Sequence, residues 1–275
     1  MEKILIAGAA LAALIGTPAI AADMALKAPP SPPACVWCGW YVGVNGGYVN
    51  SRNGLSTAAT PTPDGALGVV AGVSQGLAAL STRSIPVGSS NGFIGGGEAG
   101  YNWQFGKYLA GIEADIQGIT RSGGSGTVTA TAIVVGVPIT STQTGTMSTS
   151  YLGTLRGRLG LLVKPTWLAY VTGGLAYGGV KVSDTLSQTG TNGFAGAGSG
   201  SLSGTRAGWT LGAGLEWMVA SRWSVKAEYL HYDLGTSSFN SAPTSAFFVT
   251  PVYQTLAASA HFQGDMARAG VSYHF

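Results

Sequence analysis

The strongest constraint on the fold is an alternation of apolar and polar residues with a period of two. At the end of the chain, one face holds Ala267, Ala269, Val271, Tyr273 and Phe275, and the other holds Arg268, Gly270, Ser272 and His274. This period is typical of a β-strand with one apolar and one polar face. The strand ends on an apolar-face aromatic residue, which suits a strand end at the headgroup level of a bilayer. The alternative is the last strand of a soluble β-sandwich.

The same alternation predicts eight strands. They cover residues 39–50, 92–104, 108–118, 150–163, 167–180, 206–218, 223–232 and 267–275. Tight turns at 104–107, 163–166 and 220–222 alternate with long loops at 51–91, 119–149, 181–205 and 233–264. This zigzag predicts an all-β fold, an eight-stranded antiparallel up-and-down transmembrane β-barrel over 39–275, in the cell outer membrane. An even strand number would place both chain ends in the periplasm and the long loops outside.

The composition agrees with such a barrel and excludes other classes. Only 9% of the residues are charged, against roughly 25% in ordinary soluble domains. No run of about 20 apolar residues, as a spanning helix requires, follows the N-terminal segment. The net charge of +3 and the lack of a basic stripe give no indication of nucleic-acid binding.

The charged residues of the strands lie on the polar face. The acids are Glu98, Glu113, Asp115, Glu216 and Glu228, and the bases are Arg156, Arg158, Arg206, Lys226 and Arg268. An eight-stranded barrel is just wide enough to be filled by side chains, and buried charges must pair because a lone ion costs several kcal/mol. We therefore expect a packed plug of salt bridges, with Arg156 and Arg158 bridging to Glu113 and Asp115.

The tryptophans of the strands form a second pattern. Trp40, Trp103, Trp167, Trp217 and Trp223 share the apolar face and lie near the short turns. Tryptophan is enriched where a membrane protein meets the membrane–water interface. The pattern predicts one aromatic girdle, which Phe275 completes.

The N-terminal region is predicted to be processed. Residues 1–22 are typical of a signal peptide, with a basic start, an apolar run and a small-residue cleavage site. The alternative is a membrane anchor helix. Residues 23–38 form a Pro-rich spacer that includes Cys35 and Cys38, the only cysteines. A local disulfide is the favoured interpretation in an oxidising periplasm. A redox motif would open a helix, and zinc would need further ligands.

Several motifs together resemble a known family. They are GGEAGYNWQ at 96–104, GIEAD at 111–115, WSVKAEY at 223–229 and VSYHF at 271–275. The chain resembles the small outer-membrane barrels of α-proteobacteria, the RopB-type relatives of the Brucella major outer-membrane proteins, with an OmpA-like barrel. The resemblance implies an abundant surface protein with a role in envelope integrity, without cofactors or catalytic residues. It also implies assembly by the outer-membrane insertion machinery, which would read Val271, Tyr273 and Phe275.

Three functions are compatible with such a barrel. The first is a non-enzymatic barrel for envelope structure and surface contact, which meets outer-membrane lipid and lipopolysaccharide, with homo-oligomerisation left open. The second is a small-solute porin, against which the narrow bore and the balanced interior charge argue. The third is a lipid-modifying hydrolase that would use His231 and Asp233 with Ser237. We expect the long loops to be mobile and to carry the contacts, with a small helix or hairpin in Ala66–Leu80.

Overall fold

The structure is a computed structural model that describes residues 35–61, 72–120, 123–241, 244–247 and 250–275. The predicted signal peptide and most of the predicted spacer lie outside these residues, so both stay predictions. Residues Cys35–Phe275 form one unit, to which all that follows refers.

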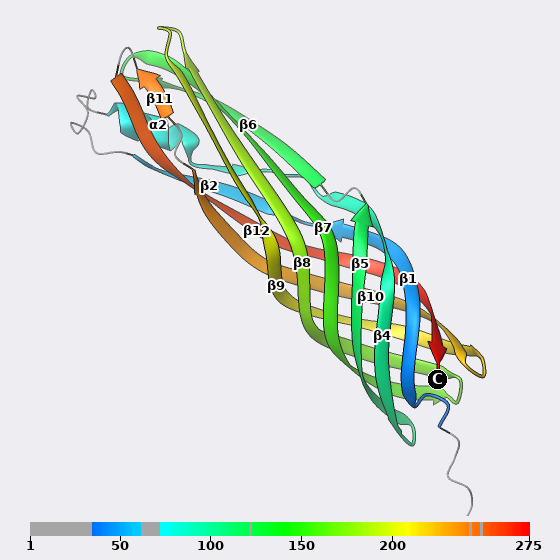
Figure 1. The fold of residues 1–275 in the computed structure, drawn as a ribbon. Helices are drawn as coiled ribbons and strands as arrows, with labels where there is room; N and C mark the ends of the chain where they lie inside the picture. The colour runs from blue at the N-terminus through cyan, green and yellow to red at the C-terminus, as the bar shows by residue number, and fades with distance from the viewer. Residues whose placement is uncertain (1–34, 62–71, 121–122, 242–243, 248–249) are drawn as a thin grey trace, which may run out of the picture. The chain divides into compact units, whose positions relative to one another are not determined.

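The described chain forms one twelve-stranded sheet and one helix (Figure 1). The strands are β1 (Gly39–Ser51), β2 (Gly54–Pro61), β3 (Arg83–Ile85), β4 (Ser90–Phe105), β5 (Tyr108–Thr120), β6 (Gly123–Val134), β7 (Val137–Lys164), β8 (Trp167–Gly190), β9 (Ala195–Ala220), β10 (Trp223–Ser241), β11 (Thr244–Phe247) and β12 (Thr250–His274), and the helix is α2 (Val73–Ser81). No described helix is long and apolar enough to cross a membrane.

Eight of the strands close a ring. Their order is β1, β4, β5, β7, β8, β9, β10 and β12, and β12 also pairs with β1. The pairings along this ring are antiparallel, with Val44 opposite Val271 where the ring closes. The predicted eight-stranded antiparallel barrel is therefore confirmed. Tight turns join β4 to β5, β7 to β8 and β9 to β10, and Gly106 adopts a φ of 64° in the first of them.

The predicted long loops are wrong over much of their length. Residues 137–149, 181–190, 195–205, 233–241 and 250–264 continue the barrel strands, so they form sheet rather than mobile loops. The predicted strand over 150–163 begins where β7 carries a bulge, which shifts the register between Thr149 and Tyr151. A bulge inserts one residue and so exchanges the two faces of the strand. A second bulge interrupts β10 between Asp233 and Thr236.

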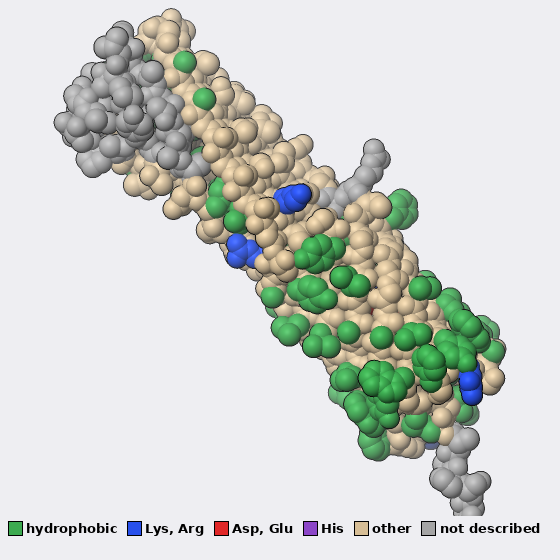
Figure 2. All heavy atoms as spheres, viewed as in Figure 1, with side chains coloured by type: hydrophobic (Ala, Val, Ile, Leu, Met, Phe, Trp, Pro, Cys, Tyr) green, Lys and Arg blue, Asp and Glu red, His purple; other side chains and the backbone are tan. Residues whose placement is uncertain are grey.

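The polarity of the two faces reverses along the strands. In β8, apolar Val171 and Leu175 face outward next to the short turns, whereas farther along the outward face holds Lys181 and Ser183, and Val182 is buried. Figure 2 shows the same division on one face of the molecule, where apolar side chains gather toward the C-terminal end. The apolar outward band is the part that lipid covers, and the remainder forms an extension in water.

Threonine stabilises the extension through its side chain and its β-propensity. The hydroxyl pairs Thr127–Thr144, Thr129–Thr142 and Thr131–Thr140 are hydrogen-bonded between β6 and β7 at 2.9, 3.2 and 2.9 Å. Threonine is favoured in strands, and such cross-strand pairs stabilise a sheet. A Ser/Thr-rich segment without charges can therefore be a strand with a wet outer face, and not only a loop.

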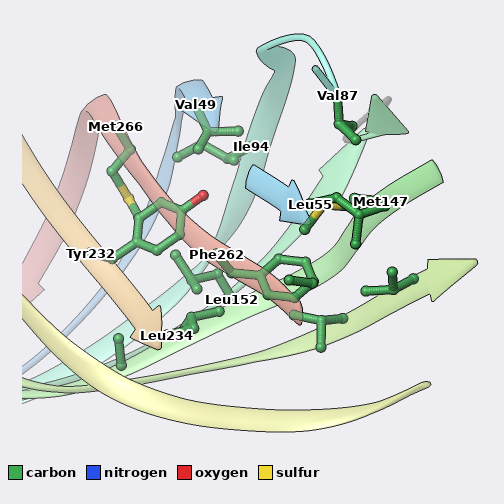
Figure 3. Packing of buried hydrophobic residues seen from close by; sticks show 14 of the residues in the cluster. Val49, Leu55, Val87, Ile94, Met147, Leu152, Tyr232, Leu234, Phe262 and Met266 are labelled. Carbon is green, nitrogen blue, oxygen red and sulfur yellow. The ribbon is translucent and has the colours of Figure 1, made fainter. Parts of the chain in front are cut away.

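Apolar side chains fill the inside of the extension. A cluster on the inner wall includes Val49, Leu152, Tyr232, Phe262 and Met266 (Figure 3). Above it, α2 buries Val73, Leu77 and Leu80 against Val134, Ile139 and Phe194. Except for its last residue, Ser81, this helix lies within the range 66–80 for which a helix or hairpin was expected, although residues 66–71 lie outside the described part.

We predict that the solvent outside the wall changes along β7 and β8. A spin label at Leu175 should be quenched by bilayer-soluble oxygen, because lipid contacts this outward position. A label at Thr142, which faces outward in the extension, should respond to a water-soluble nickel complex instead. Electron paramagnetic resonance in reconstituted vesicles measures both, and a Thr142 label protected from the nickel complex would contradict the assigned boundary.

Candidate functional site

The site that most determines the properties of the barrel is a buried charged layer in its lumen. Inward residues of β4, β5, β7, β9, β10 and β12 supply it: Glu98, Glu113, Asp115, Arg156, Arg158, Glu216, Lys226, Glu228 and Arg268, each at most 5% exposed. The strand register explains the grouping, since Glu113 lies opposite Arg156, Glu216 opposite Lys226 and Glu228 opposite Arg268.

Glu113 is the centre of this layer. Its carboxylate contacts Arg156, lies 2.9 Å from Lys226 Nζ and lies 3.5 Å from both Arg158 and Arg268. Each cation also meets a second carboxylate. Arg156 and Arg268 both reach Asp115, at 3.0 and 2.9 Å, and Lys226 reaches Glu98 at 2.7 Å. Charges from distant strands are thus joined in one network across the lumen.

Two tyrosines that the sequence analysis did not select complete the layer. Tyr41 donates to Glu113 at 2.7 Å and accepts from Arg158 at 3.0 Å. Tyr170 donates to Glu228 at 3.1 Å, and its ring centroid lies 4.2 Å from the Arg158 guanidinium carbon. Arg158 also bonds Glu216 at 2.6 Å. The residue type alone does not distinguish either tyrosine from a lipid-facing aromatic residue. The position of Tyr41 does, because it follows Trp40 directly and so lies on the opposite face of β1.

Arg206 does not join the layer, which corrects the prediction. It has inward parity on β9, but it lies ten positions beyond Glu216, at the level where β9 has already lost its pairing with β10. It is half-buried, and no ion pair to another described residue involves it. The alternation shows which face of a strand a residue occupies, but not how far along the barrel axis it lies. The sequence therefore did not separate the level of Arg206 from that of the charged layer.

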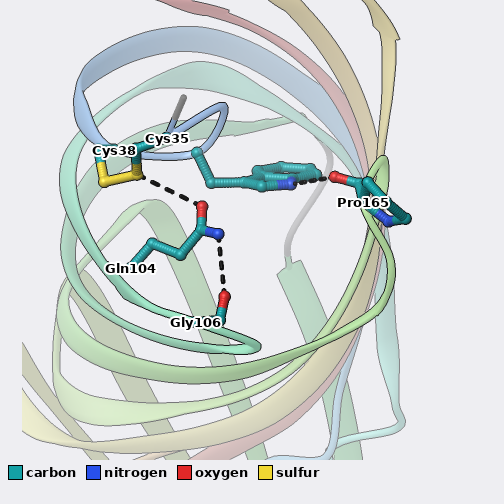
Figure 4. Close-up of a disulfide and its surroundings, with 6 residues drawn as sticks. Cys35, Cys38, Gln104, Gly106 and Pro165 are labelled. Atoms are coloured by element: carbon teal, nitrogen blue, oxygen red, sulfur yellow. Dashed lines mark hydrogen bonds between the residues drawn. A yellow bond between two sulfur atoms is a disulfide. The ribbon is translucent and has the colours of Figure 1, made fainter. Parts of the chain in front are cut away.

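Trp37 closes the lumen near the short turns, and Figure 4 shows the adjacent disulfide with Gln104, Gly106 and Pro165 around it. Cys35 and Cys38 are disulfide-bonded, and Trp37 between them is fully buried. The Trp37 indole donates to the Pro165 carbonyl at 3.0 Å and packs edge-on against His274. Leu109, Leu168 and Met218 complete its apolar surroundings. The Pro-rich composition predicted only a spacer here, because a Trp between two cysteines does not show which way it points.

The helix α2 closes the other end of the lumen. The Gln143 amide donates to the Ser81 carbonyl at 3.0 Å, and the Gln188 amide donates to the Ser81 hydroxyl at 3.0 Å. The Thr57 hydroxyl donates to the same carbonyl at 2.9 Å. The end of α2 is therefore bonded to β2, β7 and β8, which fixes the helix inside the extension.

The predicted girdle residues all face outward near the short turns. Trp40, Trp103, Trp167, Trp217 and Trp223 are 40–61% exposed, and Trp167 stacks on Trp217 with ring centroids 5.4 Å apart. Trp223 contacts Tyr273, which contacts Phe275. The arrangement presents a band of rings at one level of the wall.

The proposed hydrolase grouping does not assemble. His231 Nδ1 lies 2.9 Å from Asp265, not Asp233, and Asp233 lies 3.6 Å from His261 instead. Ser237 is buried on the inner face, whereas His231 faces outward. The β10 bulge causes this separation, because it moves residues beyond Asp233 to the opposite parity. Within the described residues, no group of three or more His, Cys, Asp and Glu side chains could hold a metal ion.

Asp184 is a buried carboxylate of the extension. It is 1% exposed, and neither oxygen has a hydrogen-bond partner within the described part of the chain. Gly145 and Gly200 flank it on the neighbouring strands, so no side chain there can donate to it. Burial raises the pKa of Asp184 from 3.8 to about 6, because the charged form loses its hydration.

We predict that Arg158→Ala destabilises the barrel. The substitution leaves Glu216 buried with less compensation, and breaking a buried pair costs about 3–5 kcal/mol. The thermal unfolding midpoint in detergent should fall clearly. Lys107→Ala, in an exposed turn, is the control and should leave the midpoint unchanged; equal midpoints for both variants would refute the pairing.

We predict a pH-dependent gain in stability from Asp184→Asn. The unfolded chain ionises this carboxyl above about pH 4, whereas the folded chain holds it protonated up to about pH 6, so ionisation penalises folding above that range. Asparagine removes the penalty. Unfolding measured at pH 8 should show Asp184→Asn more stable than wild type, and at pH 4 the difference should vanish. Asp233→Asn, whose side-chain oxygen can still accept from the Gly235 N–H, should not stabilise.

Comparisons with known proteins agree with this architecture. A model described as "Outer membrane protein beta-barrel domain" matches residues 7–275. The chain is 34% identical over 238 residues to the 31 kDa outer-membrane immunogenic protein of Brucella melitensis, which covers 82% of this chain and 85% of that protein. It is 32% identical over 158 residues to a 22 kDa outer membrane protein of Rhizobium leguminosarum bv. viciae, covering 54% and 59%.

Among solved structures, the outer membrane protein OprG of Pseudomonas aeruginosa is similar with a TM-score of 0.40 and 12% identity, over 86% of this chain and 97% of that one. Neisserial surface protein A is similar with a TM-score of 0.34 and 12% identity, over 83% and 97%.

The family match covers nearly the whole chain, and the resemblance to small α-proteobacterial barrels is confirmed. The chain belongs to the outer membrane protein β-barrel domain family and is a protein of the bacterial outer membrane.

Proposed function

We propose that this protein is a non-enzymatic barrel that stabilises the cell envelope and makes surface contacts through its extension. The observation that carries the proposal is a lumen occupied along its length. From the short turns outward it holds Trp37, the charged layer, the apolar cluster and α2. A barrel whose lumen is filled by packed side chains is more stable than an open one, and it does not conduct solutes.

The filled lumen argues against the alternative of a small-solute porin. A solute would have to displace Trp37 and separate salt bridges such as Arg158–Glu216. Separating buried partners leaves charges without compensation, at several kcal/mol for each. The apolar cluster beyond the charged layer offers an ion no hydrogen-bond partners that would replace its water.

The extension supports the role in surface contact. Its outward face is rich in hydroxyl groups, with Thr127, Thr129, Thr131 and Ser183 among them. The α2 helix fills the inside and fixes the strands relative to each other. A sheet presents side chains in fixed positions, which suits recognition at lower entropic cost than a mobile loop.

The C-terminal strand supports the proposed assembly by the insertion machinery. Val271 and Phe275 are 41% and 69% exposed on the outer face. The Phe275 amide donates to the Trp40 carbonyl at 3.0 Å, at the point where β12 meets β1. These outward side chains would be presented to the machinery before the barrel closes.

We predict no steady conductance for wild-type protein in planar bilayers, because the lumen is filled. Trp37→Ala, which opens the short-turn end alone, should also remain closed since the charged layer persists. Heat-modifiable gel migration verifies that each sample is folded. A steady wild-type conductance that depends on solute size would favour the porin and refute the proposal.

A further inference from the structure

A polar cluster lies on the outward face of the barrel at the boundary between the apolar band and the extension. Asp265 is its centre. The carboxylate accepts from the Tyr229 hydroxyl at 2.6 Å and lies 2.9 Å from His231 Nδ1 and 2.8 Å from the Arg52 guanidinium. Two donors from β10 and one from the segment after β1 thus converge on one acid of β12.

The side chains around Asp265 keep further N–H groups that do not bond this carboxylate. Arg52 carries five N–H groups, and its side chain is 65% exposed. His231 uses Nδ1 and leaves Nε2 for another partner; its ring also lies against Trp209. Because Asp265 is surrounded by donors, its charge is compensated, and the cluster presents Arg52 to the outside.

An apolar groove of about 1230 Å³ begins next to this cluster. Tyr229 belongs to both, since its ring lines the groove and its hydroxyl bonds Asp265. The floor is made of small residues, with Gly46, Ala269 and Ala227 adjacent in one cross-strand row. Tyr48 and Phe93, which contact each other, form part of its wall.

The groove runs obliquely down the lipid-facing wall. Cross-strand rows descend from β1 to β9, because Val44 shares a row with Val271, Val225 and Trp217. Trp217 belongs to the girdle near the short turns, whereas Val44 lies two outward positions beyond Trp40. The groove follows such rows from Phe93 to Leu161 on β7, so it leads from the outer boundary into the hydrocarbon region.

We propose that this surface binds one phosphorylated lipid of the outer leaflet, with a phosphate on Arg52 and His231 and an acyl chain in the groove. The proposal rests on the proposed envelope function and names its lipid partner. Guanidinium and imidazole groups recognise phosphate through charge-assisted hydrogen bonds. A free anion would use only the cluster; the continuous apolar groove favours a ligand whose anionic head and acyl chain are joined.

Titration of the folded protein with lipid A, followed by native mass spectrometry, tests the headgroup contact. Diphosphorylated lipid A should bind wild type about tenfold more tightly than the dephosphorylated lipid, and Arg52→Gln should remove most of that difference. Lys107→Gln, which changes the same charge in a turn at the other end of β4 and β5, should bind like wild type. Equal binding of both lipids by wild type would overturn the phosphate assignment.

A second pair of variants tests the groove. Ala269→Trp fills the floor without touching Arg52 and should weaken lipid A binding severalfold, whereas Ala114→Trp, outward on β5 and outside the groove, should not. Inorganic phosphate that competes as well as lipid A, or equal binding by both Trp variants, would overturn the lipid as ligand. Either failure leaves the bilayer-conductance result unaffected, so it is distinguishable from failure of the proposed function.

Discussion

The structure depends on a change of solvent along each long strand. Where hydrocarbon lies outside, the outward face is apolar, and the polar side chains point inward, as Arg156 and Glu228 do. Where water lies outside, the faces are exchanged, so that Val182 and Phe262 fill the lumen and threonines face outward. One continuous sheet can satisfy both conditions because strand side chains alternate. In β7 the bulge at Ser150 changes which residues face inward, whereas in β8 the same face simply changes from apolar to polar residues along the strand.

The exchange divides the lumen into layers with different energetics. The charged layer is stable only when every member is compensated, since buried ions without partners are costly. It holds five carboxylates against four cations, and His274 lies 3.4 Å from Glu216. The layers beside it are apolar, with Trp37 on one side and Phe262 on the other. Water therefore has little access to the ion pairs, which strengthens them.

The apolar–polar alternation predicts the parts of the strands that lipid covers, including their short-turn ends at Tyr108, Trp167 and Trp223. The extension does not carry this pattern, because its outward face meets water and is polar. Most of the charged layer was predicted by parity, since a charge facing lipid is expensive. Arg206 was included wrongly because parity is independent of height, and Trp37 was missed because it lies outside any strand.

The sequence by itself determined the class of fold, the ring of eight strands and the side of each strand that meets lipid. These follow from a period of two and from the cost of placing charge in hydrocarbon, both of which are local. Only the tertiary structure decided which charges meet, where the lumen is closed, and that Asp265 rather than Asp233 bonds His231. Such contacts depend on register, bulges and strand tilt, which bring together residues distant in the chain, and no local pattern encodes those distances.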